Sequence, residues 1–512
     1  MNRKQRRAAR KGRRSADEVL ERAFAQAVAD HKAGRLDAAE RRYRRILSAA
    51  PDHARALHNL GAIANRVGRH DQAVEFLEKA LALAPDWAEA HNSLGNALKE
   101  QGRFADALAC YDRALARDPD FAGAHNNRGN ALKELGRVSE ALAAIEKALA
   151  LMPDWPEAHN NKARVLMDLG RHGDALAGFD RALVLDPNYA DCHYNRGMLQ
   201  LLRGQFADGW AECAWRHETR YRRRHRRAFT APQWRGQDLA GGTLLLHAEQ
   251  GAGDTIQCAR YLPLAAARAG RVVVETPAPL ARLFEGLAGA DNLVDPGEPP
   301  GAPGTYDAQA SWIDLPLLLG TTLETIPADI PYLRPAPELA ASWAERLGAR
   351  GGYRVGITWA GSPEHKNDHN RSTELGAWAP LAALSRDWPD LALYSLQVGR
   401  NGEAGAHLGA AVTDLAPALT DYAETAAAMA NLDLVIAVDT SVVHLAGALG
   451  RPVWALIPFT PDWRWLLDRD DSPWYPTLHL FRQTTPGDWT GVIARVAEAL
   501  AKAAHEEGSR AT

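Results

Sequence analysis

Three segments in the second half of the chain place glycines, carboxylates and cations just after apolar runs, where side chains can act on a ligand. In the first segment Gly251 and Gly253 precede a predicted helix, and Asp254 stands at its start. Glycines allow a tight turn at this point. A carboxylate there can take a proton from a hydroxyl group or cap the helix, and one aspartate can do both. Glu249 and Gln250 belong to the same loop.

The second segment, residues 356–372, carries Lys366, Arg371 and Ser372 in a polar loop that follows an apolar run. Cations at such a point neutralise the charge that accumulates on a pyrophosphate leaving group. The competing interpretation is a polar loop that is simply solvated. We therefore treat Lys366 and Arg371 as candidate anion-binding residues.

The third segment, residues 438–465, contains a predicted helix that starts just after a buried strand. Asp439 ends the strand, Thr440 and Ser441 begin the helix, and His444 lies one turn in. Free backbone amides and the positive end of the helix dipole favour a phosphate at this start. Capping of the helix by Asp439 is the structural alternative.

The apolar runs that flank these segments predict β-strands alternating with helices. A helix is expected from about residue 254 to 269. This alternation is typical of parallel sheets wrapped by helices, and such sheets bind ligands at the carboxyl ends of their strands. The strands are expected at 243–249, 271–275, 353–361, 391–398, 433–439 and 452–458. We predict an α/β domain of two Rossmann-like lobes, 237–335 and 353–505.

A dinucleotide site is the first alternative for the glycine loop. Glu275 ends the second strand, where a ribose-binding acid belongs, but Ile256 occupies the place of the third glycine. The fingerprint is incomplete, so no dinucleotide cofactor is expected. Further along, Trp463, Trp465 and Trp474 lie in a stretch that looks too polar for a core; their rings either receive a base or sugar or pack against helices.

The first half of the chain repeats with a period of 34 residues. Gly34, Gly68, Gly102, Gly136, Gly170 and Gly204 mark turns inside each repeat, while Gly61, Gly95, Gly129 and Gly197 share a phase in the first helix. The prolines that set the period are Pro51, Pro85, Pro119, Pro153 and Pro187. This pattern predicts an α-helical solenoid of helix pairs over residues 16–220, with the sixth pair as a cap against the next domain.

Asparagines return in phase on the first helices of the repeats. They are Asn59, Asn127, Asn161 and Asn195, with Ser93 in the remaining repeat. Asparagine is a mediocre helix former, so its recurrence has a cause. It either packs between helices or forms an amide ladder that grips an extended peptide backbone through its donors and acceptors.

These motifs resemble one family of repeats and two families of transferases. The repeats are similar to tetratricopeptide repeats, and the asparagine ladder resembles that of the O-linked N-acetylglucosamine transferases. Gly253 and Asp254 resemble the glycine-aspartate turn of bacterial heptosyltransferases. The run from Asp439 to Ala446 resembles their D-T-G, two residues, H-L-A motif, with Ser441 in place of glycine. The resemblance covers about residues 230–505.

The resemblance implies a GT-B glycosyltransferase that works without a metal or other cofactor. Asp254 would act as base, and Lys366, Arg371, Asp439, Thr440, Ser441 and His444 would bind a nucleotide-sugar donor. The acceptor would be a protein or glycan recruited through the repeat groove. Two alternatives stay open: a repeat scaffold with inactive lobes, and a lipopolysaccharide-type transferase acting at the inner membrane face.

The overall charge, hydrophobicity and cysteine content of the chain limit the classes of protein to which it can belong. A net charge of −3 over 512 residues gives no global attraction to nucleic acid, and no apolar stretch is long enough to span a bilayer. Four cysteines without CxxC spacing predict neither disulfides nor a zinc site, which favours the cytoplasm. Two basic runs are expected to be solvated: a disordered tail at 1–15, and the run starting at Arg216, whose part 221–236 would be a linker.

Overall fold

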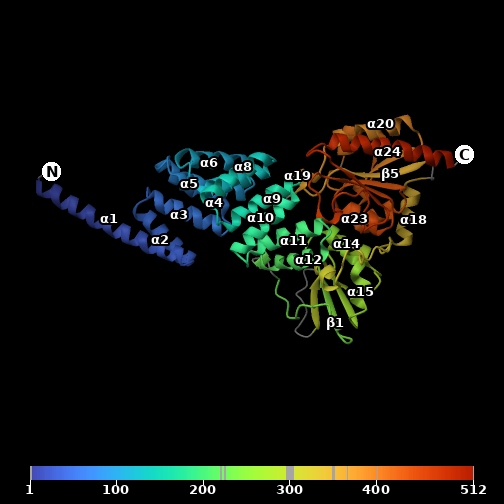
Figure 1. The fold of residues 1–512 in the computed structure, drawn as a ribbon, viewed down its shortest axis with the longest axis horizontal. Helices are drawn as coiled ribbons and strands as arrows, with labels where there is room; N and C mark the ends of the chain where they lie inside the picture. Colours follow the sequence, from blue (N-terminus) through green and yellow to red (C-terminus); the bar gives the residue numbers. More distant parts are fainter. Residues whose placement is uncertain are drawn as a thin grey trace. The chain divides into compact units, whose positions relative to one another are not determined.

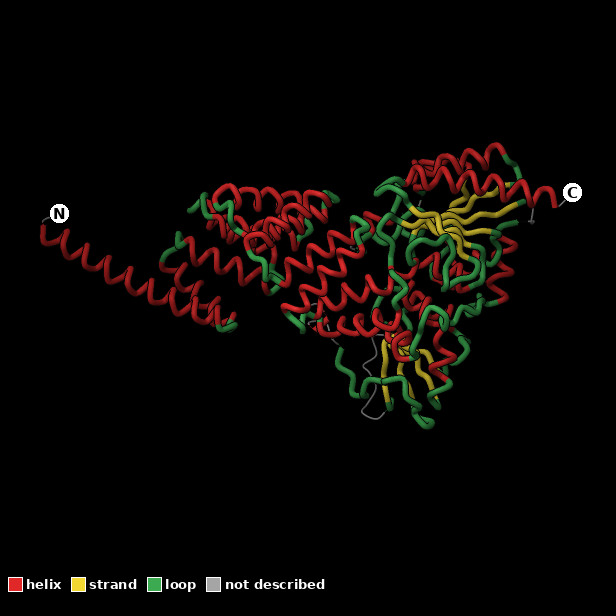
Figure 2. Tube along the Cα trace, in the orientation of Figure 1, coloured by secondary structure: helices red, strands yellow, loops and turns green. Residues whose placement is uncertain are grey.

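The computed structural model describes residues 3–219, 222–223, 227–295, 305–348, 352–365, 367–400 and 402–510. The chain folds as two compact units, Met1–Cys192 and His193–Thr512. Figure 1 shows the elements of each unit, and Figure 2 shows that helices alone form the first unit whereas both sheets lie in the second. No helix in the described part of the chain has the length and apolar character needed to cross a membrane.

The first unit is a stack of antiparallel helix pairs, as the period predicts. α1 begins at Arg3, so the backbone of the basic run expected to be a disordered tail is helical from that residue on. The helices are α1 (Arg3–Lys32), α2 (Leu36–Ala49), α3 (Ala54–Arg66), α4 (His70–Leu83), α5 (Ala88–Glu100), α6 (Phe104–Arg117), α7 (Ala122–Glu134), α8 (Val138–Leu151), α9 (Pro156–Asp168) and α10 (His172–Leu185).

Glycine makes this stacking possible in two ways. The turn residue Gly102 has a φ of +75°, a left-handed conformation in which a side chain is strained. In the first helix of a repeat, a Cβ built on Gly95 would lie 2.5 Å from Cε1 of Tyr111 on the second helix. The glycine that recurs in the first helix therefore allows the paired helices to approach closely.

The second unit begins inside α11 (Ala190–Leu202) and continues through α12 (Phe206–Cys213) and the 3-10 turn η1 (Ala214–Glu218). Trp210 of α12 donates from Nε1 to the carbonyl of Thr321 at 3.1 Å and packs edge-on against Trp463, with ring centroids 5.0 Å apart. The sixth helix pair therefore packs on the α/β lobes through α12, in agreement with its predicted role as a cap.

The first lobe is a four-stranded parallel sheet in the order β3-β2-β1-β4. The second lobe is a six-stranded parallel sheet in the order β10-β9-β8-β5-β6-β7. The strands of the first lobe are β1 (Thr243–His247), β2 (Arg271–Glu275), β3 (Asn292–Val294) and β4 (Ala308–Ser311). Those of the second are β5 (Tyr353–Thr358), β6 (Leu391–Ser395), β7 (Val412–Asp414), β8 (Leu434–Val438), β9 (Val453–Ile457) and β10 (Leu478–Arg482).

Helices cover both sheets, and α20 and α24 lie side by side on the second lobe (Figure 1). The first lobe carries α14 (Ala252–Cys258), η2 (Ala259–Tyr261), α15 (Leu262–Ala266), α16 (Ala278–Phe284), η3 (Trp312–Asp314) and α17 (Leu315–Leu318). The rest of the unit carries α18 (Pro337–Arg346), α19 (Asp368–Arg371), η4 (Leu375–Trp378), α20 (Ala379–Asp387), α21 (Glu403–Leu408), η5 (Gly409–Ala411), η6 (Ala416–Ala418), α22 (Tyr422–Met429), α23 (Ser441–Ala448), η7 (Trp463–Trp465) and α24 (Trp489–Arg510).

The six predicted strands are present within two or three residues of their expected ends. The remaining four, β3, β4, β7 and β10, were not predicted; β3, β4 and β7 are only three or four residues long, and β10 contains no β-branched residue. The single helix expected at 254–269 is divided into α14, η2 and α15.

The tryptophan-rich stretch after β9 belongs to the core, so the expectation that it is too polar for one is wrong. Trp463, Trp465 and Trp474 are all buried. Trp463 packs edge-on against Trp474, with ring centroids 5.7 Å apart. Within this stretch Arg464 pairs with Asp462 and Arg469 pairs with Asp471, so the polarity along the sequence did not reveal the burial.

The close approach of paired helices gives a stability prediction for Gly129. Gly129→Val should lower the free energy of unfolding of the repeat unit by about 1–3 kcal/mol, the usual cost of overpacking. The reason is that a Cβ on Gly129 would lie 3.0 Å from the carbonyl oxygen of Ala141, which cannot move freely. Calorimetry of the full chain measures the effect.

The matched control is Gly173→Ala in α10, where nothing lies within 4 Å of the added Cβ. Because alanine is the better helix former, this variant should be unchanged or more stable by up to about 1 kcal/mol. An unaltered repeat transition in Gly129→Val would show that the helix pair relaxes at no cost.

Candidate functional site

The loops that follow β1, β5 and β8 meet at the carboxyl ends of the strands. A Cβ built on Gly253 in α14 would lie 3.1 Å from Cδ2 of His444 and 3.3 Å from Cα of Ser441, so α14 packs directly on the first turn of α23. Arg371, at the end of α19, donates from Nη1 to the carbonyl of Asp439 at 3.2 Å. Segments far apart in the sequence thus form one site.

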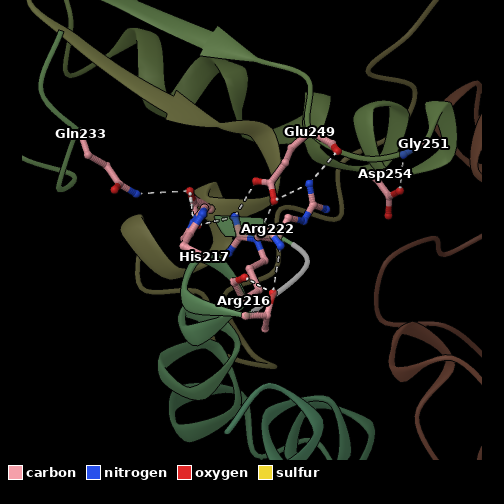
Figure 3. Close-up of polar contacts among 9 residues, drawn as sticks. Arg216, His217, Arg222, Gln233, Glu249, Gly251 and Asp254 are labelled. Carbon is pink, nitrogen blue, oxygen red and sulfur yellow. Dashed lines mark hydrogen bonds and ion pairs between the residues drawn. The ribbon is translucent and has the colours of Figure 1, made fainter. Parts of the chain in front are cut away.

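Asp254 uses both carboxylate oxygens in this site. Its Oδ2 accepts a hydrogen bond from the Gly251 amide at 2.9 Å, which caps α14 (Figure 3). Its Oδ1 forms an ion pair with Arg464 of the other lobe. The side chain is 23% exposed, so solvent reaches it. The capping role is therefore present, and the role of base remains a prediction that this position permits.

Arg464 is the principal site residue that sequence reasoning missed. It lies in η7, directly after β9, and its side chain is 9% exposed. Nη1 donates to Asp462 at 2.8 Å, Nη2 to Asp254, and Nε to Gln257. Its position after a fourth buried strand, at the same sheet edge as the other loops, was the available signal, but the tryptophans around it drew the interpretation toward aromatic contacts.

Asp439 has an altered proton affinity in this site. Burial, followed by the negative charge of Asp462, raises the pKa of Asp439 to about 6. The carboxyl group of Asp439 is therefore protonated more readily than that of an ordinary aspartate. Asp439 lies directly after β8 and just before the first turn of α23, so its carboxyl group belongs to the site.

The residues predicted at the start of α23 are Thr440 and Ser441, at its first turn, and His444, one turn further in. Thr440 is the N-cap residue and is buried, and Ser441 accepts a hydrogen bond at Oγ from the Tyr422 hydroxyl at 2.8 Å. His444 is buried, and its Nδ1 lies 2.9 Å from the Tyr475 hydroxyl. Burial holds the pKa of His444 well below its usual range, so the ring is neutral.

The loop after β5 contributes Arg371 and its supports. Ser372 donates from Oγ to Asp368 at 2.7 Å and accepts from the Gly361 amide at 2.9 Å, which fixes the loop next to β5. The Arg371 Nε lies 3.5 Å from the Asp368 carboxylate. Lys366, the other predicted cation, lies outside the described residues.

Glu249 belongs to a buried ion cluster beside the Asp254 loop (Figure 3). Arg216 of η1 donates from Nη2 to Glu249 at 2.9 Å and pairs with Asp314 at 2.7 Å, and all three side chains are at most 12% exposed. Arg222 also pairs with Glu249, at 3.3 Å. The cluster ties η1 to the loop that carries Gln250, Gly251 and Asp254.

The basic run that begins at Arg216 is therefore only partly solvated in its described part, because several of its arginines pair with acids of the first lobe while Arg223 stays exposed. Besides Arg216 and Arg222, Arg227 pairs at 2.6 Å with the buried Glu275. Acids at the strand ends of the first lobe attract these cations. The sequence of the run by itself does not show these acids, because they lie far from it along the chain. Glu275, considered as a ribose-binding acid, is occupied by Arg227.

One group of side chains in the described part of the chain has the geometry of a metal site. The ligand atoms of His217, Glu249 and Asp314 lie within 4.8 Å of one another. However, the guanidinium of Arg216 already pairs with both carboxylates. The arrangement therefore fits an ion cluster rather than a cation site.

The asparagine ladder of the repeat unit forms bonds between successive repeats. Asn127 donates from Nδ2 to Asn92 and Asn161 donates to Asn126, both at 3.0 Å. At the equivalent point Ser93 lies 2.9 Å from Nε2 of His58, while Asn59 donates to the Tyr43 hydroxyl at 3.0 Å. These bonds support the packing interpretation; peptide binding by the ladder remains a prediction. Asn195 lies in α11.

Comparison with known proteins agrees with this division of the chain. Residues 20–86, 52–120, 92–158 and 163–204 match models of the tetratricopeptide repeat. Residues 400–466 match the model of glycosyltransferase family 9 (heptosyltransferase), a stretch that includes Asp439, α23 and Arg464. The first half of the chain therefore carries tetratricopeptide repeats, and its α/β unit contains a segment that matches glycosyltransferase family 9.

Among curated proteins, it is similar to Protein FlbA of Caulobacter vibrioides, at 28% identity over 325 residues. That match covers 59% of this chain and 53% of FlbA, so the chain spans about half the length of this relative. Among solved structures, MamA is 26% identical, with 32% of this chain and 96% of MamA covered and a TM-score of 0.29. A thermophilic TPR protein of Thermus thermophilus is 26% identical, with 36% and 99% covered and a TM-score of 0.32.

The buried ion cluster gives a prediction for Arg216. Arg216→Met should lower the free energy of unfolding of the α/β unit by about 3–5 kcal/mol, because two buried carboxylates lose their cation. The matched control is Arg223→Met, whose pair with Glu218 is 64% and 47% exposed and should contribute less than about 1 kcal/mol. Urea denaturation followed by tryptophan fluorescence compares them.

The same variant should show a characteristic pH dependence. Burial opposes ionisation of Asp314, but the hydrogen bond from His217 and the charge of Arg216 outweigh it and lower the pKa of Asp314 to about 2. Since an unfolded aspartate has a pKa of about 3.9, the stabilisation is complete above that pH and is lost as the pH falls toward 2. A difference between wild type and Arg216→Met that stays constant over this range would contradict the assignment.

Proposed function

We propose that the α/β unit transfers a glycosyl group from a nucleotide-sugar donor to an acceptor hydroxyl. The observation that carries this proposal is the meeting of Asp254, Arg371, Arg464 and the start of α23 at the carboxyl ends of the strands. The family 9 match over residues 400–466 supports it independently. The proposal covers hexose and heptose donors alike.

In the proposed reaction the acceptor oxygen attacks the anomeric carbon of the donor. The bond from this carbon to the diphosphate oxygen breaks, the new glycosidic bond forms, and the acceptor proton passes to Asp254. The nucleoside diphosphate leaves with the negative charge. Backbone amides at the start of α23, together with Arg371 and Lys366, stabilise that charge, so the reaction is proposed to need no metal.

The repeat unit is proposed to recruit a protein or glycan acceptor. Repeat arrays present an extended concave surface that suits a long ligand. We further propose that the protein works in the cytoplasm; its four cysteines are all buried free thiols, which agrees with a reducing compartment. The second candidate, a scaffold with inactive lobes, shares the repeats but predicts no release of nucleotide from any nucleotide sugar.

The donor site is tested with Arg371→Ala. This variant should bind nucleoside diphosphates about tenfold or more weakly, because loss of a charge-assisted hydrogen bond costs about 1.5–3 kcal/mol. Calorimetric titration with UDP, GDP and ADP measures the affinity. The control is Arg386→Ala on the exposed side of α20, which should bind as the wild type does. Equal affinities in both variants would place the diphosphate elsewhere.

The proposed base is tested with Asp254→Asn. The side-chain oxygen of asparagine can still accept the hydrogen bond from the Gly251 amide, so α14 should persist. Turnover should fall by about 10² to 10⁴, the range for loss of a general base, with little change in donor affinity. Nucleotide release from UDP-N-acetylglucosamine, UDP-glucose and GDP-mannose measures turnover. Full activity of the variant would remove Asp254 from the mechanism.

A further inference from the structure

Arg464 connects the candidate base to the other lobe. Its Nη2 pairs with Oδ1 of Asp254 and its Nε donates to Gln257, both residues of α14 in the first lobe. Its Nη1 holds Asp462 of its own loop at 2.8 Å. Each of the three guanidinium nitrogens therefore has a partner, and two of those partners belong to the helix that carries Asp254.

The burial of Arg464 makes this connection rigid. Burial opposes its charge, but Asp462 and Asp254 outweigh that effect and raise the pKa of Arg464, so it is always a cation. The guanidinium also lies over the Trp463 ring, 4.4 Å from the centroid. A planar group held by two carboxylates, an amide and an aromatic face has little freedom to move.

The two contacts on Asp254 fix the direction of its carboxylate. Oδ2 is held by the Gly251 amide at 2.9 Å and Oδ1 by Arg464. Each carboxylate oxygen keeps a second lone pair, so the group can still accept a proton. Without Arg464, only the Gly251 amide would restrain it, and the carboxylate would rotate about that single bond.

We propose that Arg464 is a positioning residue, which holds the Asp254 carboxylate in the orientation that accepts the acceptor proton. This assignment rests on the proposed glycosyl transfer and deepens it. Arg464 links the loop after β9, within the family 9 segment, to the base on α14. The position of the base is therefore set by the same lobe that offers α23 to the donor.

A second ion pair between the lobes supplies the matched control. Arg282 of α16 reaches Asp421 at 2.8 Å and Glu424 at 3.4 Å, next to and within α22. Its side chain is 49% exposed, and it contacts none of the site residues described above. If Arg464 only fastens the lobes together, removal of Arg282 should affect turnover in the same way.

The test is a double-mutant cycle on the full chain. Nucleotide release from UDP-N-acetylglucosamine, UDP-glucose and GDP-mannose is measured with water as acceptor for the wild type, Arg464→Met, Asp254→Asn and the double variant. Arg464→Met should lower kcat by about 10², the loss expected from a displacement of about 1 Å, while the KM for the donor changes little. In the Asp254→Asn background the same substitution should cause no further loss, because there is no base left to position.

Arg464→Lys keeps the charge and guards against misfolding of the methionine variant; it should show an intermediate kcat, because lysine cannot hold Asp254 and Gln257 together. Arg282→Met should keep the kcat of the wild type. Three outcomes would overturn the assignment of Arg464 without affecting the proposed function. They are additive losses in the cycle, an unchanged kcat in Arg464→Met, and an equal loss in Arg282→Met. If the wild type releases nucleotide from none of these three hexose donors and from no nucleotide-linked heptose, the proposed function is overturned, and the assignment with it.

Discussion

Buried arginines, each facing two carboxylates, hold the α/β unit together at the points where its parts meet. Arg216 brings Glu249 and Asp314 together beside β1 and β4, and Arg464 does the same for Asp254 and Asp462 across the two lobes. Glu249 and Asp314 are buried, so their charges would be costly without Arg216, whereas Asp254 and Asp462 keep some contact with solvent and are held in place by Arg464. Because both arginines act on the loop from Glu249 to Asp254, its shape depends on segments that are distant in the sequence.

This dependence explains which parts of the site could be predicted from the sequence. A strand followed by a glycine turn and a helix is a local pattern, so the Asp254 loop and the start of α23 were recognisable. Arg464 lies 210 residues from Asp254, and no local pattern connects them. Arg216 was misinterpreted for the same reason: within its basic run it resembles a solvated cation, and only the fold brings the buried acids to it.

The repeats show the opposite case, because nearly every determinant of their fold is local and periodic. A turn glycine such as Gly102, with its positive φ, and a contact glycine such as Gly95, against Tyr111, are visible in the sequence as a phase. The ladder asparagines were visible too, but their partners were not. Asn127 and Asn161 each bond to the asparagine one position earlier in the preceding repeat. The periodic asparagines therefore have a structural role here, because they link successive repeats through side-chain hydrogen bonds.

The charges of the site restrict how a diphosphate can be held. Arg464 is paired with Asp254 and Asp462, and Arg371 lies against Asp368, so both cations are already partly neutralised. Asp439 adds a carboxyl group whose pKa is raised to about 6 by burial and by Asp462. In the proposed donor site, an ionised Asp439 would repel a phosphate at the first turn of α23, and a protonated Asp439 would not. The backbone amides at the start of this helix would then be the main hydrogen-bond donors to the diphosphate, and their contribution would be largest where Asp439 is uncharged.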